Sequence, residues 1–158
     1  KGVNLLAEYN QTQPYTYGHR TILQNYSHMN QALAHPLGAN FKEVVVMAEY
    51  KKDKWRYKLK FTTASVGLDS LNMHYGQNIF EADSAASTGG QYSYGNFNGQ
   101  GVLTALSTMN AEIAYSLKWL DIFGSVYYKK KKSDLINQTS LWYSVGIRTF
   151  PFSAFTDY

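Results

Sequence analysis

The sequence predicts an all-β fold, in which about six antiparallel strands belong to a transmembrane β-barrel with long extracellular loops. Three observations indicate this class. Apolar and polar residues alternate in several segments. Long polar loops alternate with tight turns along the chain, and aromatic residues gather at predicted strand ends. Mean hydropathy is only −0.38, and no run approaches the roughly 20 apolar residues of a membrane helix. A transmembrane β-strand does not need such an apolar run, because only alternate residues of the strand face lipid.

The first predicted strand is Val3–Gln11. Its apolar residues recur at every second position, and Glu8 and Asn10 fall between them. Successive side chains of a strand point to opposite faces, so the pattern gives one apolar face and one polar face. The segment is about as long as a tilted transmembrane strand needs to be.

The clearest hairpin is Phe41–Thr63, with a charged turn at residues 51–54 that contains Asp53. Asp favours such turns. The second half of the hairpin separates its side chains completely. One face carries Trp55, Tyr57, Leu59, Phe61 and Thr63, and the other carries Arg56, Lys58, Lys60 and Thr62.

Three more strands follow in the second half of the chain. Alternation runs over residues 108–119, resumes at 122–130 after a turn near 120–121, and returns at 141–149 after a basic loop near 129–138. In the first of these, Met109, Ala111 and Ile113 oppose Asn110, Glu112 and Ala114. This is the most regular period-two segment of the chain.

The lengths of the connections suggest how the strands sit in a membrane. Long loops near 12–40, 64–107 and 129–138 alternate with the tight turns, so that all long loops lie at one end. Outer-membrane barrels have short periplasmic turns and longer extracellular loops. Six strands are too few to close a barrel, which needs about eight. We therefore expect residues 1–158 to be the C-terminal portion of one larger barrel domain in the bacterial outer membrane. Aromatic residues at strand ends fit an interfacial girdle: Tyr9, Tyr50, Trp55, Trp119, Tyr128 and Phe150.

Charged side chains of the strands are expected to face the barrel lumen. A charge on the lipid face near mid-membrane costs about 2–4 kcal/mol. Such a lumen is either plugged by salt bridges or forms a cationic wall that guides an acidic polymer. The residues predicted to face it are Arg56, Lys58, Lys60, Glu112, Lys118 and Arg148, together with Glu43 and Glu49.

Several motifs resemble the RemB-like proteins of Bacteroidetes, outer-membrane β-barrels related to the Wzi capsule-assembly family and associated with gliding motility. The similar segments are AEYN (Ala7–Asn10), PYTY (Pro14–Tyr17) with His19, NYSHMNQ (Asn25–Gln31), LAHPLGANF (Leu33–Phe41), YGQNIF (Tyr75–Phe80), GQG (Gly99–Gly101) and SVGIRT (Ser144–Thr149). The resemblance spans most of the chain and corresponds to the C-terminal part of such a protein. It implies surface loops that engage exopolysaccharide or motility and secretion partners. It implies no catalytic residues.

The loop near 12–40 is the predicted ligand-binding segment. Aromatic faces cover the apolar side of a sugar ring, while amides and imidazoles bond its hydroxyls. The alternatives are that these side chains only pack the loop or plug the lumen. The candidate residues are Tyr15, Tyr17, His19, Asn25, Tyr26, His28 and His35.

The sequence offers little support for a metal site, an enzyme active site or a nucleic-acid-binding surface. The spacing of His19, His28 and His35 matches no metal-ligand pattern, and Cys is absent. No nucleophile elbow or phosphate-binding loop occurs, and all four histidines fall in predicted loops, so we expect neither an enzyme nor a cofactor. Sheets that bind nucleic acid carry cations and aromatic rings on the same face. In residues 55–63 they lie on opposite faces, which argues against nucleic-acid binding. Lys129–Lys132 is predicted to be a solvated loop or one that meets lipopolysaccharide phosphates.

We therefore expect a non-catalytic outer-membrane protein that contacts lipid and lipopolysaccharide and binds exopolysaccharide or partner proteins through its loops. Two alternatives stay open. One is a passive outer-membrane channel, and the other is a soluble β-sandwich module that binds carbohydrate.

Overall fold

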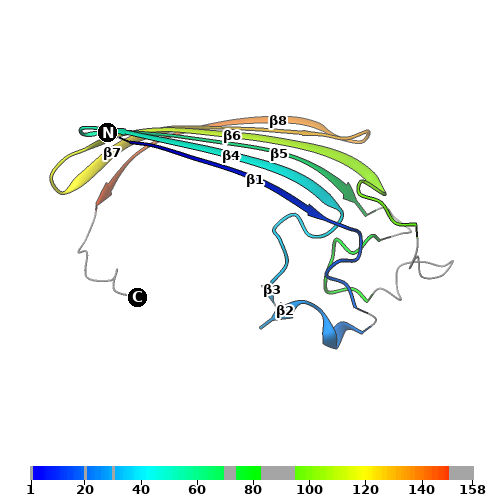
Figure 1. The fold of residues 1–158 in the computed structure, drawn as a ribbon. Helices are drawn as coiled ribbons and strands as arrows, with labels where there is room; N and C mark the ends of the chain where they lie inside the picture. Colours follow the sequence, from blue (N-terminus) through cyan, green and yellow to red (C-terminus); the bar gives the residue numbers. More distant parts are fainter. Residues whose placement is uncertain (1, 20, 30, 70–73, 83–94, 150–158) are drawn as a thin grey trace.

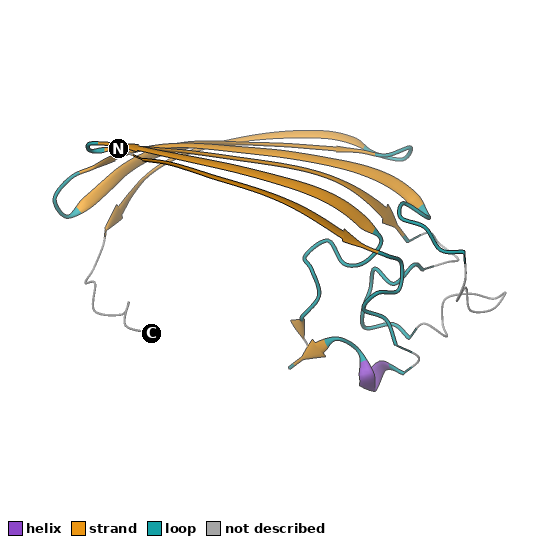
Figure 2. Ribbon diagram, viewed as in Figure 1, coloured by secondary structure: helices purple, strands orange, loops and turns teal. Residues whose placement is uncertain are grey.

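The structure, a computed structural model, describes residues 2–19, 21–29, 31–69, 74–82 and 95–149. Six long strands dominate it: β1 (Gly2–Thr12), β4 (Phe41–Lys52), β5 (Trp55–Leu68), β6 (Val102–Ser116), β7 (Leu120–Lys132) and β8 (Asn137–Thr149). The first long loop also holds a short 3-10 helix, η1 (Ile22–Gln24), and a minimal strand pair, β2 (Ser27–His28) and β3 (Gln31–Ala32). Figure 2 shows how strongly strands prevail. The all-β prediction is confirmed.

The long strands form one antiparallel sheet in the order β1-β4-β5-β6-β7-β8, so each strand pairs with its neighbours in the chain. Among the described residues the sheet is open, with β1 and β8 at its edges. The sheet is curved, and the folded parts of the long loops lie on its concave side near one end (Figure 1). No helix in the described part of the chain is both long and apolar enough to span a membrane.

The register gives the sheet an apolar face and a polar face, named here for the side chains they carry. On the apolar face, three consecutive rows cross all six strands without a charged side chain. Many of these side chains are open to solvent: Leu5 is 76% exposed and Val145 is 86% exposed. The rows are Ala7–Val46–Phe61–Met109–Tyr128–Leu141, Leu5–Ala48–Leu59–Ala111–Val126–Tyr143 and Val3–Tyr50–Tyr57–Ile113–Gly124–Val145.

Strands β5 and β6 are longer than the sequence predicts. The expected loop at 64–107 is confined to residues 69–101, because β5 continues to Leu68 and β6 begins at Val102. In this region the polar face becomes apolar, with Ala64, Val66 and Leu106 under the loops. The opposite face carries Thr63, Ser65 and Ser107 there, so apolar and polar residues exchange faces and the alternation that marks the rest of the strand changes phase.

Two other sequence-based boundaries are wrong. The basic loop near 129–138 is mostly strand: β7 runs to Lys132, and a short turn follows in which Ser133 Oγ accepts from the Leu135 and Ile136 amides. The turn expected at 120–121 lies at residues 117–119, where Leu117 N donates to the Leu120 carbonyl at 2.7 Å. Lys118 is therefore a turn residue and does not project from a strand, as the lumen-facing prediction required. The turn predicted at 51–54 is confirmed in place but is shorter, because β4 runs to Lys52 and only Asp53, at φ +54°, and Lys54 make the turn.

The small hydrophobic core lies between the polar face and the long loops. Phe41, Ala64 and Val66 are at most 5% exposed, and Leu37, Leu68 and Leu106 pack against them. All of these except Leu37 belong to the sheet. The loops thus close over one end of the polar face, while the apolar face stays uncovered by any described residue.

Candidate binding surface on the folded long loops

Asn40 joins the two long loops, residues 13–40 and 69–101, to the sheet. Its side chain is fully buried, and Nδ2 donates to the carbonyls of Gly67 at 2.9 Å and Gln100 at 2.8 Å. Oδ1 accepts from Gly99 N at 2.8 Å. Its φ of +60° belongs to the left-handed region, which Asn adopts more readily than most residues. One buried amide therefore satisfies three backbone groups from separate segments.

Asn98 makes a second cross-link beside the first. Its Nδ2 donates to the backbone carbonyls of Thr12 and Phe41, and its Oδ1 accepts from Gln11 Nε2 at 2.8 Å. These partners lie on β1 and at the start of β4. The segment 95–101 is consequently fastened across the ends of two strands, β1 and β4, which gives the loops a fixed position over the sheet.

Tyr15, a predicted ligand residue, serves the contact between the loops. Its hydroxyl donates to the His74 carbonyl at 2.6 Å, and its amide donates to the Tyr75 carbonyl at 2.9 Å. It has φ +62°, and its backbone lies so close to Gly76 that a Cβ atom there would come within 2.6 Å of Tyr15 Cα. Tyr15 is therefore engaged in packing.

His35 is held in one tautomer by its neighbours. Nδ1 accepts from Leu37 N at 3.2 Å, so Nε2 carries the proton of the neutral ring and donates toward Glu43 Oε2 at 3.3 Å. The ring stacks on Phe41 with centroids 4.5 Å apart. Asn10 Nδ2 also donates to Glu43, at 3.1 Å. His35 and Asn10 thus supply hydrogen bonds to the Glu43 carboxylate, which is buried beside the core.

The remaining predicted ligand residues lie toward solvent. Tyr17 and Tyr26 stack with centroids 5.8 Å apart and 20° between their planes, and Tyr26 is 51% exposed. His19 and His28 are exposed, and Asn25 is half-buried and accepts from the Ser27 hydroxyl. The structure therefore brings the half-buried Tyr17 and the exposed Tyr26 together as an aromatic pair and does not gather the histidines around one point.

A pocket lies between the two loops. It has a volume of about 300 Å³ and is lined by residues that include His35, Gln77, Asn78 and Phe80. Leu33, which lies between the lining residues Ala32 and Ala34, donates its N–H to the Tyr26 carbonyl at 3.0 Å, so the backbone of Tyr26 is tied to this wall of the pocket. The sequence prediction missed Gln77–Phe80. Their amides and aromatic ring in YGQNIF were a signal, but the approach of the two loops could not be read from either loop alone.

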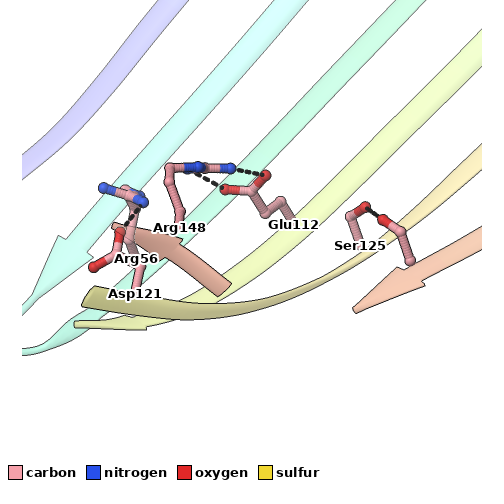
Figure 3. Close-up of polar contacts among 6 residues, drawn as sticks. Arg56, Glu112, Asp121, Ser125 and Arg148 are labelled. Carbon is pink, nitrogen blue, oxygen red and sulfur yellow. Dashed lines mark hydrogen bonds and ion pairs between the residues drawn. The ribbon is translucent and has the colours of Figure 1, made fainter. Parts of the chain in front are cut away.

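The polar face carries two ion pairs near the tight turns (Figure 3). Arg56 Nη2 lies 2.5 Å from Asp121 Oδ2, and the Asp121 side chain is fully covered. Arg148 bonds both oxygens of Glu112, at 3.5 and 3.2 Å, and its guanidinium lies 4.7 Å from the centroid of Phe123. Of the residues predicted to face the lumen, Arg56, Lys58, Lys60, Glu112 and Arg148 share this face.

Among the described residues of the loops, Asp69 is the titratable group whose pKa is displaced. Burial raises the pKa of the Asp69 carboxyl above 3.8, and the hydrogen bond that it accepts from Tyr75 N at 2.6 Å only partly opposes this. The described residues include no group of three or more acidic, His or Cys side chains that could hold a metal ion.

Comparison with family models, with curated proteins and with solved structures found no match to this chain.

Proposed function

We propose that the chain is part of an outer-membrane β-barrel whose folded long loops bind exopolysaccharide or a motility or secretion partner at the cell surface. The observation that carries the proposal is the uncharged apolar face, which has three full rows and is uncovered in the described part of the chain. A lipid bilayer is an environment that stabilises such a face, while the charged face would line the lumen.

The edges of the apolar band support a tilted passage through a membrane. In the row next to the tight turns, β4 contributes Lys52 while β5 to β8 contribute Trp55, Tyr115, Ile122 and Ile147. In the row on the loop side, Tyr9 and Val44 are apolar on β1 and β4 while β7 contributes Lys130. Going across the sheet from β1 to β8, the uncharged band therefore shifts toward the end that carries the tight turns. Strands that cross a membrane at about 35–45° require this shear.

An aromatic cluster at the tight turns further supports the proposal. Trp55 contacts Tyr57 and Tyr115, with centroid distances of 6.3 and 4.9 Å, and Tyr57 stacks on Tyr50 at 6.1 Å. All four rings lie on the apolar face, at the boundary with the turns. Trp and Tyr concentrate at this level in membrane proteins because their rings are apolar and their N–H or O–H groups remain near water.

The aromatic pair Tyr17 and Tyr26 is the feature of the loops that favours a sugar ligand. An exposed stack covers the apolar side of a pyranose, and nearby amides bond hydroxyls. The resemblance to RemB-like capsule-assembly barrels agrees with this assignment. The two alternatives are less well supported. Loops packed on the polar face obstruct a free channel, and a soluble sandwich needs a second sheet over the apolar face, which no described segment provides.

The test is to extract the intact protein from its native membrane with detergent and to run it on a denaturing gel with and without heating. We expect a heat-modifiable band well above 17.9 kDa, the mass of the present chain. A water-soluble species of that mass would overturn the membrane assignment. Retention of cell-surface polysaccharide by the detergent-purified protein tests the binding role separately.

A further inference from the structure

Four consecutive lysines occupy the loop-side end of β7, and the strand divides them between the two faces. Lys129 and Lys131 pair with Thr108 and Leu106 and lie on the polar face. Lys130 and Lys132 pair with Ser107 and Ala105 on one side and with Thr139 and Asn137 on the other, and they lie on the apolar face. Both are exposed. A run that reads as one basic patch in the sequence is therefore two separate pairs of cations.

The outward pair has no acidic partner. Neither Lys130 nor Lys132 forms an ion pair within 4.0 Å or lies over an aromatic ring in the described part of the chain, and their cross-strand neighbours are uncharged. Asp134, in the next turn, does not pair with them either. Two lysines of the opposite end differ, because Lys54 and Lys118 lie 6.0 and 5.4 Å from the rings of Tyr115 and Trp119.

The pair sits directly beside the apolar rows. One step further along the same face are Tyr128 and Leu141, followed by Val126 and Tyr143. Cations at the border of a wide apolar surface complement a molecule with an anionic head and hydrocarbon chains. We infer that Lys130 and Lys132 bind the phosphate groups of an acylated glycolipid of the lipid A type, with its acyl chains against Tyr128 and Leu141. This inference rests on the proposed function, because it requires the apolar face to lie in a bilayer.

The matched control lies on the same strand. Lys130→Gln with Lys132→Gln removes two charges from the apolar face, and Lys129→Gln with Lys131→Gln removes two from the polar face. The intact protein is reconstituted into vesicles of phosphatidylcholine alone, with diphosphorylated lipid A, or with lipid A that lacks both phosphates. Flotation with the vesicles reports insertion, and the lipid retained after mild detergent extraction is measured by mass spectrometry.

We expect all three proteins to insert, and the Lys130/Lys132 variant to bind diphosphorylated lipid A about 10- to 30-fold more weakly than the parent. The Lys129/Lys131 variant should match the parent. Equal losses in both variants, or equal retention of the dephosphorylated lipid, would overturn the inference while leaving the barrel intact. Displacement by inorganic phosphate at the same concentration would also overturn it, since the lysines would then hold free phosphate. Failure to insert into any vesicle would overturn both the inference and the proposed function.

Discussion

The side-chain amide of Asn40 lies against the backbone of Gly67, and each residue depends on the other. Asn40 Nδ2 donates to the Gly67 carbonyl, and Gly67 N donates to the Asn40 carbonyl, both at 2.9 Å. A Cβ atom on Gly67 would overlap Asn40 Nδ2 and the Gln100 carbonyl. The contact thus combines a glycine needed for close approach with an amide that satisfies backbone groups of β5 and the second long loop.

Replacement of Asn40 by Ala is expected to open the long loops and leave the sheet intact. The change leaves one buried and two part-buried backbone groups without this partner, at up to about 1–3 kcal/mol each. Limited proteolysis should then cut residues 13–40 and 95–101 much faster while far-ultraviolet circular dichroism stays unchanged. Asn40→Gly separates two causes, because glycine keeps the positive φ but lacks the amide. If Asn40→Gly resists protease like the parent, the backbone conformation and not the hydrogen bonds holds the loops.

Gly146 is expected to tolerate substitution far less than Gly124. A Cβ atom on Gly146 would lie 2.8 Å from Phe123 Cζ, whereas the nearest atom to one on Gly124 is 3.9 Å away. Val at 146 must displace the ring on which Arg148 lies and should cost about 1–3 kcal/mol. Val at 124 should be neutral or stabilising, because glycine weakens strands. The midpoints of urea unfolding in detergent compare the two, and equal midpoints would mean that Phe123 has free space.

The sequence predicts the sheet well and the loop assembly poorly, for a physical reason. Where one face is apolar and the other charged, as at Trp55–Phe61, period-two alternation marks both strand and orientation. Where the loops cover the polar face, Ala64, Val66 and Leu106 are apolar while Thr63 and Ser65 point the other way, so the alternation changes phase and hides the strand ends. The role of Tyr15 depends on its contact with His74 and Gly76, which are distant in sequence. Such contacts leave no local signal.

Leu59→Arg is expected to prevent stable membrane assembly. Leu59 occupies the middle uncharged row of the apolar face, where a cation at mid-bilayer costs about 2–4 kcal/mol. Lys58→Leu, one residue away on the polar face, is the control and should assemble normally. The readout is the heat-modifiable fraction recovered from the membrane. Loss of assembly in Lys58→Leu with survival of Leu59→Arg would reverse the assignment of the two faces.

The folded second loop is expected to become less stable as pH rises through the range in which Asp69 ionises. Burial raises the pKa of the Asp69 carboxyl above its unfolded value of 3.8. The folded loop therefore holds the proton more tightly than the unfolded one, and it loses stability between pH 3.8 and the raised pKa. Exchange of the Tyr75 amide, corrected for its intrinsic rate, should show this opening. Asp69→Asn keeps an acceptor oxygen and should abolish the dependence. An unchanged pH profile in that variant would assign the effect to another group.

Tyr17 and Tyr26 are expected to carry ligand binding without contributing to the fold of the loops. Their rings stack at 5.8 Å, Tyr26 is 51% exposed, and neither belongs to the hydrophobic core, so truncation of both to Ala removes the platform for a sugar ring. We expect about a tenfold loss in affinity for cell-surface polysaccharide, on the scale of one aromatic contact. Replacement of both by Phe retains the stack and should preserve most of the binding. Tyr15→Phe removes only the hydroxyl that bonds the His74 carbonyl, and should loosen the loops without directly removing ligand contacts. If the double Ala variant binds as tightly as the parent while its loops remain protected from protease, this aromatic pair is not the ligand platform.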